Sequence, residues 1–155
     1  LFLHSASLLY EGKAWLFSGS SGTGKSTHTN LWHTLWGTPV LNGDLNLLAI
    51  KDGKPMIYGT PWCGTSGISD STSYPLGGVV LLKQASGERL ETLSPDEQII
   101  GLLQRIISSS DTCFSLCKNL EVIGEITKQI PVFRLHCTKE PQAAIYMKEQ
   151  IDALR

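Results

Sequence analysis

Hydrophobic and polar positions divide this chain of 155 residues into short apolar runs and longer amphipathic segments. Short apolar runs bounded by Gly, Pro, Asn and Asp are typical of buried strands. Polar residues 42–44 interrupt one of these runs without ending it. The pattern predicts strands over residues 1–10, 14–17, 39–50, 76–84 and 130–137.

Four further segments carry apolar residues at the three- and four-residue spacing of an amphipathic helix. They cover residues 26–36, 94–108, 112–127 and 140–154. The first ends at Gly37 and Pro39, which stop a helix. The second has a complete start signal, because Ser94 is a favoured N-cap, Pro95 suits the first helical position and Glu97 completes a capping box.

Turn residues link several of the predicted strands. Glu-Gly at 11–12 predicts a turn after the first strand, and Asp-Gly at 52–53 predicts a hairpin. The segment 88–93 is strand-like, and the turn "ASG" before it suggests pairing with the strand 76–84. Strands early, a mixed middle and helices late predict an α/β domain with a mixed sheet.

Composition narrows the class of protein. The chain is 41% apolar and 17% charged, which is typical of one globular domain over residues 1–155. A net charge of −1 argues against an extended nucleic-acid surface, and no apolar run of 18 residues could cross a membrane. The start "LFLHSASLLY" lacks a Met, a basic region and a cleavage site, so we expect a fragment that is truncated at its N-terminus.

The cysteines form no pair of CxxC motifs, so a zinc knuckle is not expected. They lie at positions 63, 113, 117 and 137. The simplest interpretation is buried free thiols in the reducing cytoplasm.

The stretch "FSGSSGTGKSTHTNLW" has the spacing of a phosphate-binding loop, with Gly19, four residues, and then Gly24-Lys25-Ser26. Glycines allow backbone N–H groups to surround an oxyanion, and the dipole of the following helix adds to the attraction. Lys25 would reach the outer phosphates, and the Ser26 hydroxyl would bind Mg²⁺. The alternative is a Gly-rich turn beside a surface lysine. The motif predicts ATP and Mg²⁺ bound by Gly19, Ser20, Ser21, Gly22, Thr23, Gly24, Lys25, Ser26 and Thr27.

An acid follows at the distance that this chemistry requires. Asp44 lies 19 residues after Lys25, at the end of the strand that follows the helix. It could bind Mg²⁺ together with Ser26, directly or through water, or accept a proton from an acceptor hydroxyl. The alternative is a turn aspartate beside Asn42 and Gly43.

Two basic residues are weaker candidates. His4 would approach the loop if its strand pairs with residues 14–17, although a lone His is more often structural. Arg134 could supply charge to a transferred phosphoryl group, although an arginine at a strand edge more often faces solvent.

Together these positions resemble a known family. "LHSASLLYEGKAWLFSGSSGTGKST", with Asp44 after it, resembles the catalytic domain of HPr kinase/phosphorylase, and "SGTGK" is similar to the phosphoenolpyruvate carboxykinases of the same fold. The resemblance implies a mixed β-sheet P-loop domain flanked by helices. It also implies catalytic roles for three residues: His4 on the strand before the loop, Lys25 in the loop, and Asp44 as the proton acceptor for a target serine.

The resemblance is specific over residues 1–50 and weaker through "YPLGGVVLLK". The loop "GTPWCGTSG" is more similar to small HPr-kinase-like proteins, some linked with peptide modification. Two positions depart from the family pattern. Gly43 replaces the first of two adjacent acids, and "STSYPLGG" lacks a second metal-binding acid, for which Asp70 is the nearest substitute.

These observations leave three hypotheses. The first is a kinase that transfers the γ-phosphoryl group of ATP to a serine-type hydroxyl on a protein, peptide or small molecule, which the loop 59–75 with Trp62 would grip. The second is a nucleotide-binding module without catalysis, acting as a regulatory or partner protein. The third is a nucleotide hydrolase that acts as a switch. Such domains often form homo-oligomers, but the sequence identifies no interface.

Overall fold

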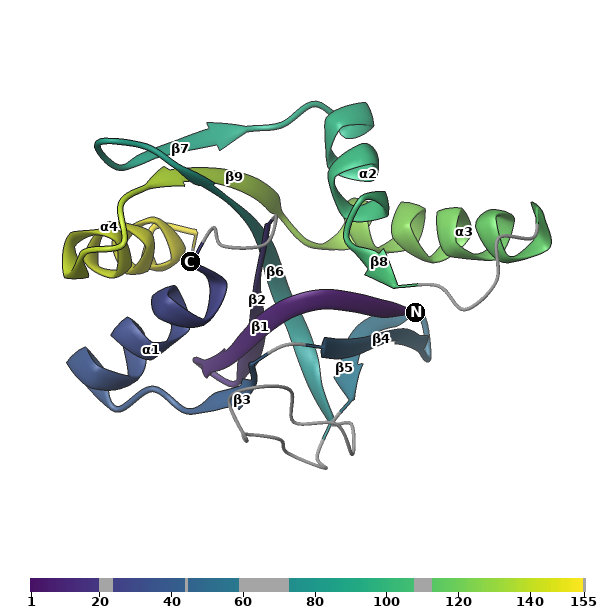
Figure 1. The fold of residues 1–155 in the computed structure, drawn as a ribbon. Coiled ribbons are helices and arrows are strands. Elements are labelled where there is room, and N and C mark those ends of the chain that lie inside the picture. Colours follow the sequence, from purple (N-terminus) through teal and green to yellow (C-terminus); the bar gives the residue numbers. More distant parts are fainter. Residues whose placement is uncertain (20–23, 44, 59–72, 108–112, 155) are drawn as a thin grey trace.

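The computed structural model describes residues 1–19, 24–43, 45–58, 73–107 and 113–154. Within these residues the chain forms a mixed sheet with helices on both sides (Figure 1). The strands are β1 (Phe2–Tyr10), β2 (Lys13–Ser18), β3 (Val40–Asn42), β4 (Leu45–Lys51), β5 (Lys54–Tyr58), β6 (Ser73–Gln84), β7 (Arg89–Thr92), β8 (Ile106–Ile107) and β9 (Val132–Cys137). The helices are α1 (Lys25–Trp36), α2 (Pro95–Leu103), α3 (Cys113–Gln129) and α4 (Pro141–Asp152).

The strand pairing closes part of the sheet on itself. The strands follow the order β2-β1-β4-β5-β6-β9-β7, and β2 also pairs with β6. Strands β1, β2, β6, β5 and β4 therefore form a closed circuit. The pairs β2–β6 and β6–β9 are parallel, so the carboxyl ends of these three strands meet at one edge. The phosphate-loop segment leaves β2 at this edge, and the chain enters α4 from β9 at the same edge.

The turns predicted at 11–12 and at 52–53 are confirmed as hairpins. Strands β1 and β2 pair from Ser5 opposite Ser18 to Tyr10 opposite Lys13, and β4 pairs with β5. Glu11 and Asp52 adopt the positive φ values of 55° and 53° that a tight hairpin turn requires.

Two core clusters lie on opposite faces of the strands. Helices α1 and α4 pack side by side on one face, and α2 and α3 lie together on the other (Figure 1). Trp32 of α1 is completely buried against Leu8 of β1 and Phe17 of β2, as the apolar spacing of this helix predicts. The core beneath α2 and α3 includes Leu3, Leu16, Leu48, Val79, Leu102, Ile123 and Ile126.

The Gly-Gly pair of the "LGG" strand has a packing reason. Trp15 of β2 lies opposite Gly78 of β6. A Cβ atom added at Gly78 would lie 2.4 Å from Trp15 Cζ3, and one at Gly77 would lie 2.6 Å from Trp15 Nε1. The two glycines therefore allow the indole to cover β6, which holds β2 and β6 in register.

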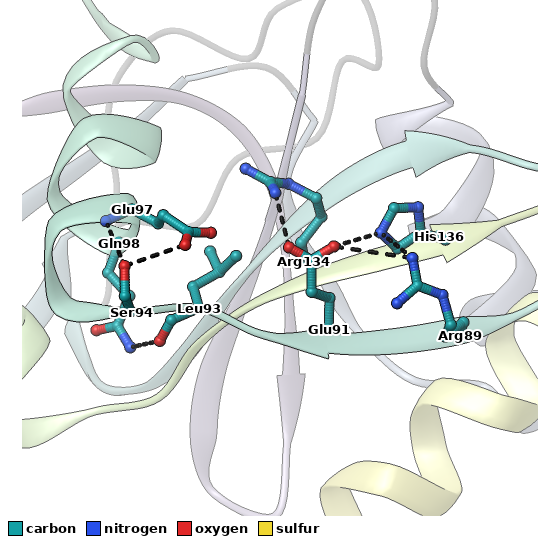
Figure 2. Close-up of polar contacts among 8 residues, drawn as sticks. All are labelled: Arg89, Glu91, Leu93, Ser94, Glu97, Gln98, Arg134 and His136. Atoms are coloured by element: carbon teal, nitrogen blue, oxygen red, sulfur yellow. Dashed lines mark hydrogen bonds and ion pairs between the residues drawn. The ribbon is translucent and has the colours of Figure 1, made fainter.

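The start of α2 is confirmed in detail. Glu97 N–H donates to Ser94 Oγ at 3.3 Å, and Pro95 occupies the first helical turn. The Ser94 hydroxyl in turn donates to Glu97 Oε1 at 3.1 Å (Figure 2). Ser94 thus satisfies a backbone group that the helix itself leaves without a partner.

Three expectations are wrong. The helix predicted over 94–108 ends at Leu103, and Ile106–Ile107 instead form β8, which pairs with β1. The segment 88–93 does not pair with β6, because β7 pairs with β9. Over residues 79–81 both edges of β6 are already occupied, by β2 and by β9, so the returning chain joins the next strand outward. The thiols are also not uniformly buried: Cys137 is buried as expected, but Cys117 is exposed on α3. In the described part of the chain, no helix is both long and apolar enough to cross a bilayer.

Candidate functional site

The phosphate-loop segment connects β2 to α1. Gly19 follows the end of β2, and residues 20–23 lie outside the described residues. Gly24 has φ 98° and ψ 30°, a left-handed conformation that strongly favours glycine. The first hydrogen bond of α1 runs from His28 N–H to Gly24 O at 2.8 Å. The amides from Gly24 to Thr27 therefore have no partner within the helix and begin a turn that contains no acidic residue.

Lys25 and Ser26 tie the ends of this segment together. The Lys25 ammonium donates to Gly19 O at 3.4 Å, so its side chain spans the described ends of the loop. The Ser26 hydroxyl donates to Gly43 O at 3.2 Å. Gly43 directly precedes Asp44, which lies outside the described residues. The start of α1 and the segment that carries the predicted acid are therefore neighbours, as the sequence spacing predicts.

His4 lies beside the point where the loop begins. Ser5 pairs with Ser18 in the β1–β2 ladder, and the Ser18 hydroxyl donates to His4 O at 2.5 Å. Alternation along β1 puts the half-buried His4 on the same face as Leu8, which packs toward α1. The expected pairing of its strand is confirmed, and a catalytic role for its ring stays a prediction.

A buried polar cluster, which the sequence patterns did not reveal, supports the segment around Asp44. Asn46 Nδ2 donates to Ser5 O at 2.8 Å and to Ser5 Oγ at 2.9 Å, and Ser7 Oγ donates to Asn46 Oδ1 at 2.7 Å. Asn42 Oδ1 accepts from Leu45 N–H at 3.1 Å. These bonds hold β1 to both strands that flank Gly43. The sequence did contain one signal for this cluster, namely polar side chains inside otherwise apolar strands.

A second missed residue is Lys139, which lies between β9 and α4. Its aliphatic carbons approach Gly24, because a Cβ atom added there would lie 3.1 Å from Lys139 Cε. No local pattern of residues indicated this contact, since it depends on β9 lying two strands from β2 in the sheet. The chain thus brings two lysines, Lys25 and Lys139, to the start of α1.

Buried contacts on its inner face fix the first two turns of α1. The rings of His28 and Phe17 lie 4.5 Å apart, and Trp32 Nε1 donates to His28 Nε2 at 3.1 Å. Burial lowers the pKa of His28 from 6.5 to about 4. The ring is therefore neutral at physiological pH and anchors the helix without adding charge to the loop.

Arg134 is held elsewhere. Its guanidinium forms an ion pair with Glu91 at 2.9 Å, and His136 Nε2 lies 2.9 Å from the other oxygen of this carboxylate (Figure 2). The hydrogen bond from His136, together with the charges of Arg134 and Arg89, lowers the pKa of Glu91. The cluster crosslinks β7 and β9, which favours the structural interpretation of Arg134.

A cavity of about 550 Å³ opens at the opposite end of β2. Its walls include Lys13, Trp15, Gly77 and Pro131. A six-residue strand is about 20 Å long, so a ligand in this cavity would lie a strand's length away from the loop. We therefore regard the loop, and not this cavity, as the candidate site.

The donor atoms near the loop fit a metal ion held mainly by a bound phosphate group. Among the described residues, no three His, Cys, Asp or Glu side chains gather to form a protein-only metal site. Ser26 Oγ is a hard oxygen of the kind Mg²⁺ accepts, and Asp44 would be the second ligand. The predicted grip region 59–72, with Trp62 and Asp70, lies outside the described residues.

Comparison with solved structures relates this fold to a known one. The chain is similar to the HPr(Ser) kinase/phosphatase from Coxiella burnetii, with a TM-score of 0.51 and 11% sequence identity, over 99% of this chain and 89% of that chain. No protein-family model matches the sequence, and no curated protein matches it. The likeness shows a distant relationship of fold.

Proposed function

We propose that this chain is a nucleotide-dependent phosphotransferase that binds ATP with Mg²⁺ at residues 19–27 and passes the γ-phosphoryl group to a serine-type hydroxyl. The observation that supports this proposal most directly is the pair of contacts from Lys25 to Gly19 and from Ser26 to Gly43. Together they gather a lysine, a hydroxyl, a helix N-terminus and the segment of Asp44 at one edge of the sheet. The kinase-like fold supports the same interpretation.

Binding would depend on the first turn of α1. Its amides, which no hydrogen bond within the helix uses, and its dipole favour the phosphates, and Lys25 supplies a full positive charge. Ser26 and Asp44 would hold Mg²⁺, which would supply positive charge to the phosphates when bound. The buried Asn46 cluster keeps the flanking strands in place, so that these groups need little rearrangement.

Transfer needs a base and charge stabilisation. Asp44 would take the proton of the acceptor hydroxyl while the oxygen of that hydroxyl bonds to the γ-phosphorus. The bond from that phosphorus to the oxygen bridging it to the β-phosphate breaks, and ADP leaves. Lys25 and His4 would stabilise charge on the transferred group. The acceptor would be a protein, a peptide or a small molecule, gripped by the loop 59–75.

A nucleotide-binding module without transfer is the second candidate, and Gly43 favours it. The family pattern has an acid at this position, whereas here the backbone carbonyl of Gly43 accepts the Ser26 hydrogen bond. A single carboxylate at Asp44 could hold metal without activating an acceptor. Binding and transfer must therefore be measured separately.

Calorimetric titration with ATP, with and without Mg²⁺, tests the binding step. We expect Lys25→Ala to abolish measurable binding, while Lys128→Ala, an exposed lysine paired with Glu125 on α3, binds like the wild type. Ser26→Ala should lose the gain in affinity from Mg²⁺ but keep metal-free binding, with the exposed Ser86→Ala as its control. Absence of wild-type binding at millimolar ATP would refute the proposal.

Turnover distinguishes the two candidates. We expect ADP release in the presence of serine-containing peptides, with phosphoserine detected by mass spectrometry, and no release from Asp44→Asn even though this variant still binds ATP. Binding without release from the wild type, for every acceptor offered, would support the module.

A further inference from the structure

We infer that Lys139 is a second cationic ligand for the polyphosphate chain of the bound nucleotide, opposite Lys25. This inference rests on the proposed function, because it assigns a further residue to the same site. Lys139 lies outside the phosphate-loop motif and reaches the loop only through the fold.

The side chain of Lys139 lies along the loop glycine. A Cβ atom added at Gly24 would lie 3.1 Å from Lys139 Cε, 3.3 Å from Cγ and 3.5 Å from Cδ. The whole stem therefore packs on this residue, and the ammonium is one bond beyond Cε. Lysine stems commonly cover a surface in this way while the charged group stays accessible.

The connection that carries Lys139 is held by its neighbours. Thr138 donates to Glu88 Oε1 from its hydroxyl at 2.7 Å and from its backbone N–H at 3.4 Å. Thr138 Oγ1 also accepts from Glu140 N–H at 3.2 Å. Thr138 is therefore fixed to the turn between β6 and β7, and Glu140 is fixed to Thr138, which keeps the stem near Gly24.

The local charge favours an anionic ligand. Within the described part of the chain, no carboxylate forms an ion pair with the Lys139 ammonium, although Glu88 and Glu140 are close in the fold. Glu88 is engaged by Thr138. Helix α1 begins at this edge without an acid in its first turn, and α4 begins there after its N-cap residue Glu140. The dipole of α1 and two lysines thus act on the same region.

A chain of phosphate groups is the ligand that suits two lysines placed in this way. Lys25 approaches the described start of the loop at Gly19, and Lys139 covers its end at Gly24. A chain of linked phosphates bound beside Gly19 and Gly24 would therefore interact with both ammonium groups. A lysine used in this way acts as a point charge and needs no fixed geometry.

Calorimetry with ATP and with inorganic tripolyphosphate tests the assignment. We expect Lys139→Ala to raise the Kd for both ligands by the same factor, roughly tenfold, because each loses one charge-assisted contact. Lys139→Arg should restore most of the affinity, and the loss should shrink at high salt. Lys128→Ala is the matched control, and thermal unfolding confirms that each variant is folded.

Three other outcomes of these titrations would count against the inference, and one of them would also remove the proposed function. Unchanged affinity of Lys139→Ala for both ligands overturns the inference while the proposed function stands. Weaker ATP binding with unchanged tripolyphosphate binding also overturns it, because Lys139 would then contact the nucleoside. Failure of the wild type to bind either ligand would remove the proposed function and this inference together.

Discussion

Trp32 donates its indole N–H to His28 Nε2 at 3.1 Å, one turn earlier on the same helix. An indole nitrogen can only donate, so Nε2 is the acceptor and the proton of the neutral ring is on Nδ1. Nδ1 is buried and has no hydrogen-bond partner among the described residues. Protonation of this ring would place a charge in an apolar environment between Phe17 and Trp32.

This relationship predicts a loss of stability in mild acid. The pKa of His28 is lowered from 6.5 to about 4 in the folded state, so below pH 6.5 the unfolded chain binds more protons than the folded chain. The neutral His28 ring makes its full contribution to the free energy of unfolding above pH 6.5, and this contribution is lost progressively as the pH falls toward 4. We expect a decrease of about 2 kcal/mol in the free energy of unfolding between pH 7 and pH 5. Urea denaturation at a series of pH values measures it.

The exposed His33 supplies the control. His28→Gln should flatten the profile between pH 6.5 and pH 5, and His33→Gln should leave it unchanged. The pKa of Glu91 is lowered below its usual 4.5, so this carboxylate loses its stabilising effect only at lower pH. A wild-type profile that is level from pH 7 to pH 5 would contradict the assignment.

Removal of the Asn46 side chain should destabilise the fold and the site together. Asn46→Ala leaves Ser7 Oγ and the backbone oxygen of Ser5 without their buried partner. We expect a loss of roughly 3 kcal/mol in the free energy of unfolding. Asn30→Ala, at an exposed position of α1, should cost far less. Denaturant titration of both variants is the measurement, and equal losses would show that the cluster contributes little.

Substitution of Gly78 should separate β2 from β6. The Cβ atom of Gly78→Ala would lie 2.4 Å from Trp15 Cζ3, which forces the indole to move. We expect a loss of roughly 2 kcal/mol in the free energy of unfolding. Gly87→Ala is the matched control, because nothing lies within 4 Å of a Cβ atom there. If thermal unfolding shows the two variants equally stable, Trp15 does not hold this register. A reduced cost of Gly78→Ala in a Trp15→Leu background would confirm that the two residues interact.

Local chemistry made several features predictable from the sequence. The N-cap at Ser94, the turn at Asp52 and the helix that follows Gly24 each depend on residues only a few positions apart. Backbone propensity and side-chain caps act over that range, so a short sequence is enough to determine them. The site roles of Ser20–Thr23 and of Asp44 stay predictions, since these residues lie outside the described part of the chain.

The sequence by itself determined that α1 follows β2, where the other helices lie, and the hairpins β1–β2 and β4–β5, because each of these is specified by neighbouring residues. Only the tertiary structure decided that β7 joins β9, that Asn46 bonds to Ser5 and Ser7, and that Lys139 covers Gly24. Those contacts join distant parts of the chain, and they depend on which strand edges are already occupied when the sheet assembles. Pairing of that kind follows from the packing of the whole domain, which no local pattern of residues encodes.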